Sequence, residues 1–259
     1  MKRFPVIVSI PHGGDLIPPE VSDEILLSPR DVFEDGDPFS RQIYDLGERV
    51  QAVVATGIAR AVVDLNRAPD DLPPHNPDGV IKTVTALGVP IYRNRLLPGE
   101  KTRLLLERYY FPYHNRLDAE SKKPGLELAL DCHTMLPIGP VTARDKGRQR
   151  PLICLGNTGG CDGTGEGTSC PVELLNTLKE GFHRAFADAD VETAGGVHFN
   201  DPFSGGYITR RHGSGALPWV QVEINRAVYM DARWFDSDFR RIRFLRERLQ
   251  QCLAYVFGA

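Results

Sequence analysis

The sequence predicts an α/β fold with three layers, in which helices cover both faces of a mostly parallel mixed sheet. Short apolar runs alternate with stretches of helical periodicity, an order typical of strand–helix–strand units. The first run, Val6–Ile10, is nearly continuously apolar, as expected for a strand buried on both faces. With 259 residues, 41% of them hydrophobic, the chain can bury a sizeable core, and we expect a single domain over residues 1–259.

The N-terminal half contains the elements in this order. After the strand at 6–10, residues 41–50 have helical spacing of apolar side chains, and the apolar run 59–66 is predicted to be the second strand. Residues 102–120 form a long helical pattern that Pro112 interrupts.

The C-terminal half is predicted in the same way. Residues 127–135 are the third strand, 191–200 and 218–225 are later strands, and 236–257 form a closing helix. The Gly- and Pro-rich segments 70–79 and 156–167 are expected to be long loops within the domain. In α/β folds such loops often carry the chemistry, because sites form at the carboxyl ends of strands.

Charge and composition exclude several classes of protein. A net charge of −3 argues against a dedicated nucleic-acid binder, and no run is long enough to cross a bilayer. The first residues make a poor signal peptide, so we expect a cytoplasmic protein. Three of the five cysteines, Cys154, Cys161 and Cys170, lie close together without the paired C-x-x-C spacing of zinc knuckles, which favours free thiols.

Polar and ionisable residues recur where the predicted core strands end. Burying such groups is costly unless they are paired or bound to a metal, so a shared polar pocket is the simplest explanation. The residues concerned are His12 after the first strand, Asp64, Asn66 and Arg67 at the second, Asp131 and His133 at the third, and Glu223, Asn225 and Arg226 at a late one.

Two of these residues are natural zinc ligands. Two histidines and one carboxylate bind a catalytic zinc and leave a position for water, and His12 and His133 supply the nitrogens. The carboxylate is Asp15, in an H-x-x-D with His12, or Asp37, which precedes a predicted helix. Asp131 shares a strand face with His133 and is expected to orient the site.

Other residues are suited to binding an anionic substrate. The guanidinium of Arg67, beside Asn66, matches the two oxygens of a carboxylate. In the segment 205–215, Arg210 is placed to hold a second carboxylate, and Tyr207 or Thr209 to donate to a developing oxyanion. No G-x-S-x-G elbow is present, which argues against metal-free serine hydrolysis.

Five motifs in order resemble those of the N-formylglutamate amidohydrolase family. They are "PHGG" (11–14), "DLNR" (64–67), "DCHT" (131–134), "GGYITR" (205–210) and "VQVE" (220–223). Each motif alone is weak, but the five in sequence cover nearly the whole chain.

The resemblance implies a fold similar to zinc carboxypeptidases and aspartoacylases, a phosphorylase/hydrolase-like architecture, with one Zn²⁺ per chain. It implies that His12 and His133 bind the metal, that Glu223 is the general base, and that Asn66 with Arg67 clamps a substrate carboxylate. The related enzymes use H-x-x-E where this chain has Asp15, and the family has an acid that matches Asp37, which is therefore preferred as the third ligand.

The implied function is zinc-dependent hydrolysis of N-formyl-L-glutamate, or a related small N-acyl amino acid, in amino-acid breakdown. One alternative is a metal-dependent hydrolase of a different small amide or peptide. Another is a catalytically silent metal-binding relative, against which His12, His133 and Glu223 count because all three are present. The expected partner is a small molecule rather than a nucleic acid or a membrane, and the oligomeric state is left open.

Overall fold

A six-stranded mixed sheet, with strand order β2-β1-β3-β6-β4-β5, forms the centre of the computed structural model, which describes residues 3–189, 191–231, 236–237 and 239–259. All neighbouring strands are parallel except β4 and β6, which are antiparallel. The strands are β1 (Phe4–Ile10), β2 (Val50–Ala55), β3 (Leu128–Met135), β4 (Ile153–Gly156), β5 (Val197–Phe199) and β6 (Trp219–Asn225). The predicted α/β class with a mostly parallel sheet is confirmed.

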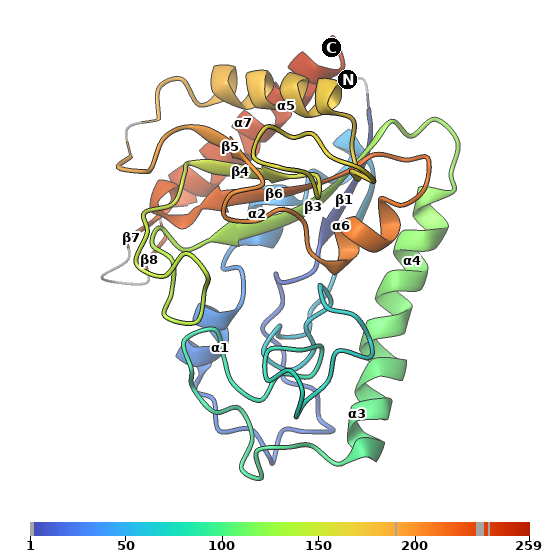
Figure 1. Ribbon diagram of the computed structural model, residues 1–259, viewed down its shortest axis with the longest axis vertical. Helices are drawn as coiled ribbons and strands as arrows, with labels where there is room; N and C mark the ends of the chain where they lie inside the picture. Colours follow the sequence, from blue (N-terminus) through green and yellow to red (C-terminus); the bar gives the residue numbers. More distant parts are fainter. Residues whose placement is uncertain (1–2, 190, 232–235, 238) are drawn as a thin grey trace.

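Helices and irregular segments cover both faces of this sheet (Figure 1). The helices are α1 (Pro29–Asp35), α2 (Ser40–Tyr44), α3 (Gly99–Leu105), α4 (Phe111–Ser121), α5 (Val172–Ala185), α6 (Tyr207–His212) and α7 (Phe239–Val256). α2, α5 and α7 pack on one face. α4, α6 and the largely irregular segment 57–98 pack on the other. A separate antiparallel pair, β7 (Met230–Asp231) and β8 (Asp236–Ser237), lies beside the sheet.

The prediction of a strand at 59–66 is wrong. The second strand along the chain is β2, which begins at Val50, where the predicted helix 41–50 was expected to end. The α-helix in that range, α2, ends at Tyr44. Residues 59–66 form turns, in which the Val62 and Val63 amides donate to the Ala59 carbonyl. This segment is almost fully buried, and a short buried apolar run has the same pattern whether it is extended or not.

The helix predicted at 102–120 is confirmed, and a π-helical turn divides it into α3 and α4. Between α3 and α4 the helix widens into a π-helical turn, Leu106–Tyr110. Pro112 follows in the first turn of α4, and it has no N–H for a bond to the preceding turn. The wider turn accommodates this proline without ending the helix.

The remaining elements agree in part. β3 and β6 lie at the predicted strands 127–135 and 218–225. Within the predicted helix 236–257, α7 begins at Phe239, Asp236–Ser237 form β8, and residue 238 lies outside the described residues. Only three residues of 191–200 form a strand, β5, and β4 was not predicted. None of the described helices has the length and apolar character needed to cross a membrane.

Candidate active site

Three side chains from separate parts of the fold converge at the carboxyl ends of β1 and β3. His12 lies just after β1, His133 is on β3, and Asp37 follows α1. His133 Nδ1 lies 3.1 Å from His12 Nδ1 and 3.0 Å from Asp37 Oδ2, and His12 Nδ1 lies 3.5 Å from the same oxygen. Among the described residues, this is the only group of three or more His, Cys, Asp or Glu side chains close enough to hold one metal ion.

The triangle of donor atoms fits a tetrahedral zinc ion. Bonds of about 2.0–2.1 Å in a tetrahedron separate the ligand atoms by roughly 3.3 Å, which matches the three edges of 3.0–3.5 Å. The donor set, two imidazoles and one carboxylate, is also the kind that catalytic zinc prefers. The residues present therefore fit this metal and leave a fourth position for water.

The outward nitrogen of His12 is fixed by Asp64. His12 Nε2 lies 2.8 Å from Asp64 Oδ1, and a carboxylate only accepts, so Nε2 donates and Nδ1 presents its lone pair to Asp37 and His133. Asp64 is fully buried, and Arg60 Nε donates to its other oxygen over 3.1 Å. Burial opposes the carboxylate, but the charges of His12, Arg67 and Arg60 hold the pKa of Asp64 well below its usual range.

His133 has a matching partner in Asp131, as expected from their shared strand face. His133 Nε2 lies 3.3 Å from Asp131 Oδ1, and Ser9 and Thr209 donate to the two Asp131 oxygens. Asp131 is thus the acceptor that favours hydrogen on Nε2 and leaves Nδ1 for a metal. Burial opposes the imidazolium, but the carboxylates of Asp131 and Asp37 raise the pKa of His133 well above its usual value. The surroundings therefore favour a positive charge at this position.

Arg226 holds Asp37 in place, a role that was not predicted. Its Nη2 donates to Asp37 Oδ1 over 3.2 Å and to the Gly36 carbonyl over 2.5 Å, and the Asp37 amide donates to the His12 carbonyl. Burial opposes the carboxylate, but the hydrogen bonds and positive charges that His12 and His133 supply when protonated hold the pKa of Asp37 well below its usual range. Asp15 is exposed and outside this cluster, so of the two candidate carboxylates the structure brings only Asp37 to the histidines.

Glu223 lies on β6 directly opposite His133 on β3. Its Oε1 accepts from Gln221 Nε2 over 2.7 Å, and Gln221 Oε1 accepts from the Gly206 amide over 2.6 Å. These bonds fix the Gln221 amide, so one oxygen of Glu223 is held while the other stays available. Burial raises the pKa of Glu223, as suits a group that takes up a proton. Gln221 lies in a predicted motif, but no role was assigned to it.

A pocket of about 910 Å³ opens over these residues. Its wall includes Arg60, Arg67, Arg144, Arg148, Arg150, Arg210 and Arg226. Five of these arginines pair with carboxylates, whereas the side chains of Arg144 and Arg210 make no ion pair or hydrogen bond with any described residue. Two unpaired cations in the wall favour an anionic ligand.

Of the four residues predicted to bind substrate, three line the pocket and one does not. Asn66 and Arg67 line the pocket together with His12, Asp37 and His133, as Arg210 does from α6. Asn66 Nδ2 lies 3.2 Å from His133 Nε2, and Asn66 Oδ1 accepts from the Ile208 amide. Arg67 Nη2 donates to Asp78 Oδ2 over 2.8 Å, which orients the guanidinium. Thr209 is fully buried and donates to Asp131, so the structure does not bring it into the pocket.

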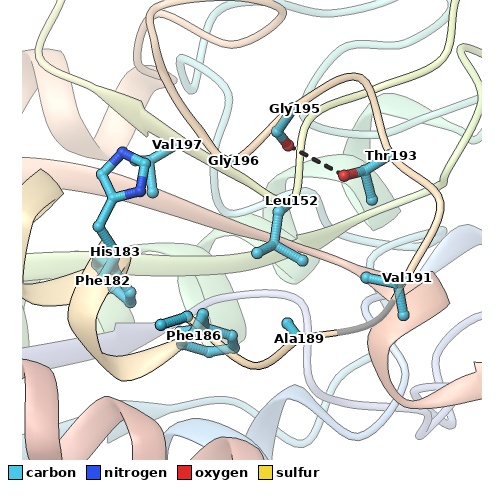
Figure 2. A pocket seen from close by; sticks show the side chains of 11 residues that line it. Leu152, Phe182, His183, Phe186, Ala189, Val191, Thr193, Gly195, Gly196 and Val197 are labelled. Carbon is cyan, nitrogen blue, oxygen red and sulfur yellow. Dashed lines mark hydrogen bonds between the residues drawn. The ribbon is translucent and has the colours of Figure 1, made fainter.

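A second hollow, of about 250 Å³, lies between α5 and the segment before β5 (Figure 2). Most residues that line it are apolar, and His183 is the one histidine among them. The cysteines Cys154, Cys161 and Cys170 are free thiols, as expected.

Comparisons with known proteins agree on one family. The family model described as N-formylglutamate amidohydrolase matches residues 4–230. N-formylglutamate deformylases from Pseudomonas putida and Pseudomonas aeruginosa are 30% and 29% identical, each over 88% of this chain and 83% of their own length. The crystal structure of N-formylglutamate amidohydrolase from Ralstonia eutropha JMP134 is 20% identical and superposes with a TM-score of 0.75, over 100% of this chain and 94% of that one.

Proposed function

The chain belongs to the N-formylglutamate amidohydrolase family, and we propose that it is a zinc-dependent amidohydrolase that cleaves N-formyl-L-glutamate or a closely related N-acyl amino acid. The observation that carries this proposal is the triangle of His12 Nδ1, His133 Nδ1 and Asp37 Oδ2 next to the buried Glu223. The relatives named for this activity support the choice of substrate.

In this proposal His12, Asp37 and His133 hold the ion. When bound, Zn²⁺ would polarise the scissile carbonyl and lower the pKa of water at the site toward about 7. Asp64 and Asp131 orient the two imidazoles, and Arg226 orients the Asp37 carboxylate.

Glu223 is the general base and then the general acid. Because Oε1 is held by Gln221, Oε2 takes the proton from the attacking water. The water oxygen bonds to the formyl carbon as the C–N bond breaks, and Glu223 returns the proton to the leaving amine. The products are formate and the free amino acid.

Arg67 and Arg210 bind the two carboxylates of the substrate, with Asn66 beside Arg67. Asp78 fixes the plane of the Arg67 guanidinium and leaves N–H groups free for a ligand. Arg210 has no partner among the described residues, so a bound carboxylate would be its first.

Hydrolysis of N-formyl-L-glutamate and of N-formyl-L-glutamine tests the proposal, because the second compound lacks only the side-chain carboxylate. We expect kcat/KM to be at least 100-fold higher for the first compound in the zinc-loaded wild type. Arg210→Met should lower kcat/KM for N-formyl-L-glutamate to near that for N-formyl-L-glutamine.

Arg211→Met is the matched control. Arg211 lies on α6 next to Arg210, but its side chain pairs with Asp118 on α4 and does not line the pocket. Its preference for the glutamate compound should remain. A zinc-loaded wild type that hydrolyses neither compound would refute the proposed function. An unchanged preference in Arg210→Met would refute the role of Arg210.

A further inference from the structure

Lys82 is a completely buried lysine that the proposed mechanism does not use. Its side chain is 0% exposed, and the residue belongs to the irregular segment that connects β2 with α3. The ammonium donates to Asp35 Oδ1 and Oδ2 over 3.0 and 3.1 Å and lies 3.0 Å from Asp78 Oδ1. A buried ammonium carries a large desolvation penalty, and an apolar side chain would fill the same space at lower cost. The position of Lys82 therefore calls for an explanation beyond packing.

One partner, Asp35, belongs to the metal-binding end of the pocket. Asp35 is the last residue of α1 and lies two residues before the ligand Asp37. Besides Lys82, its side chain accepts from the Ala86 amide over 2.6 Å, and its carbonyl accepts from Arg60 Nη1. Lys82 thus holds in place the backbone segment that precedes Asp37.

The other partner, Asp78, belongs to the substrate-binding end. Asp78 Oδ2 accepts from Arg67 Nη2 over 2.8 Å, and the Asp78 carbonyl accepts from Arg67 Nε. Its side chain is 49% exposed, so a carboxylate without Lys82 would be free to turn toward solvent. Lys82 thus fixes the group that orients the Arg67 guanidinium.

Ion pairs connect Lys82 to a network of three cations and three anions. Lys82, Arg60 and Arg67 are the cations, and Asp35, Asp64 and Asp78 are the anions. Through Asp64 the same set reaches His12. The network therefore contacts both the metal ligands and the proposed substrate arginine.

We infer that Lys82 is a positioning residue that sets the placement of Asp37 relative to Arg67, by holding Asp35 and Asp78 together. This inference rests on the proposed function for the role of Arg67. Its metal-binding part, through Asp35 and Asp37, is testable without any substrate.

The double variant Lys82→Met/Asp35→Asn tests the inference. It removes both buried charges together, and the asparagine oxygen still accepts from the Ala86 amide. We expect a folded protein whose Kd for zinc, measured by competition with a chelating dye, is about tenfold higher than in the wild type. KM for N-formyl-L-glutamate should rise at least tenfold, with kcat within threefold of wild type.

Lys101→Met is the matched control. Lys101 pairs with Glu24 outside the pocket, so its removal also cuts a lysine–carboxylate pair. The Kd for zinc and KM should both stay at the wild-type values.

Asp78→Ala is a second variant, at the half-exposed end of the network, where truncation is compatible with folding. It should raise KM at least tenfold and leave the Kd for zinc unchanged. This result would support the part of the inference in which Asp78 orients Arg67, even where the double variant does not fold. An unchanged KM in Asp78→Ala would refute the role of Asp78 in orienting Arg67.

A folded double variant with wild-type Kd and KM would overturn the inference, because Lys82 would then only neutralise Asp35. A wild type that is inactive on N-formyl-L-glutamate would refute the proposed function instead. In that case the comparison of zinc Kd values still decides whether Lys82 positions the metal-binding end.

Discussion

Gly206 is the point at which the pocket leaves no space for a side chain. A Cβ atom at this position would lie 2.2–2.5 Å from the Nδ2, Oδ1 and Cγ atoms of Asn66. Comfortable contacts begin near 3.5 Å, so Gly206→Ala forces the Asn66 amide to move by roughly 1 Å. That shift breaks the 2.8 Å bond from the Ile208 amide to Asn66 Oδ1.

The cost follows from these contacts. Leaving the buried Ile208 amide without an acceptor costs about 1–3 kcal/mol, and the overpacking itself costs about as much. We therefore expect a loss of about 2–6 kcal/mol in the free energy of unfolding, a large part of the roughly 5–15 kcal/mol by which folded proteins are typically stable. A displacement of about 1 Å next to His133 should also lower kcat/KM by up to about 100-fold.

Denaturant unfolding and steady-state kinetics measure these effects, with Gly215→Ala as the matched control. Gly215 is exposed, and the nearest heavy atom to an added Cβ would be 4.0 Å away. If Gly206→Ala matched Gly215→Ala in both stability and kcat/KM, the close packing of Asn66 under α6 would be refuted.

Three further variants test single contacts. Glu223→Gln should lower kcat by about 10²–10⁴-fold in steady-state assays and leave the Kd for zinc unchanged; substantial remaining activity would exclude Glu223 as the base. Asp64→Asn should raise the Kd for zinc about 10–100-fold in a chelator competition, because His12 loses the charge of its partner; an unchanged Kd would contradict this role. Thr209→Val should cost about 1–3 kcal/mol of stability, since Asp131 loses a buried donor, and leave KM unchanged; a raised KM would indicate direct contact with substrate.

The convergence of His12 and His133 could be anticipated from the sequence because it depends on local rules. His12 directly follows the nearly continuously apolar β1 after Pro11, His133 lies near the end of β3, and parallel neighbouring strands present their carboxyl ends at one edge of the sheet. The same rule accounts for Glu223, which pairs with His133 across β3 and β6. The alternation of side chains along β3 likewise placed Asp131 beside His133.

Contacts between segments far apart in the chain could not be anticipated in this way. Arg226 reaches Asp37 across 189 residues, and no local pattern reports this contact. The choice between Asp15 and Asp37 depended on the family resemblance, because either carboxylate has suitable spacing for a loop that folds back. Lys82 lies in a segment without periodicity, so its burial depends entirely on tertiary packing.

The error at 59–66 has a related cause. That segment and β2 are both apolar, and the sequence pattern reports burial rather than conformation. Asp64, Asn66 and Arg67 nevertheless reach the pocket, because turns bring this segment beside the end of β1 through bridges from Gly14 to Ala59 and from Leu16 to Ile58.

Zinc stoichiometry of the purified protein, measured by elemental analysis after loading and dialysis, tests the central claim most directly. The wild type should retain one Zn²⁺ per chain, and His133→Ala should lose it. His183→Ala, which removes an exposed histidine on α5 that belongs neither to the cluster nor to the pocket over it, should retain the ion. A wild type that holds no zinc, or a His133→Ala variant that holds as much as the wild type, would contradict the assignment of His12, Asp37 and His133 as the metal site.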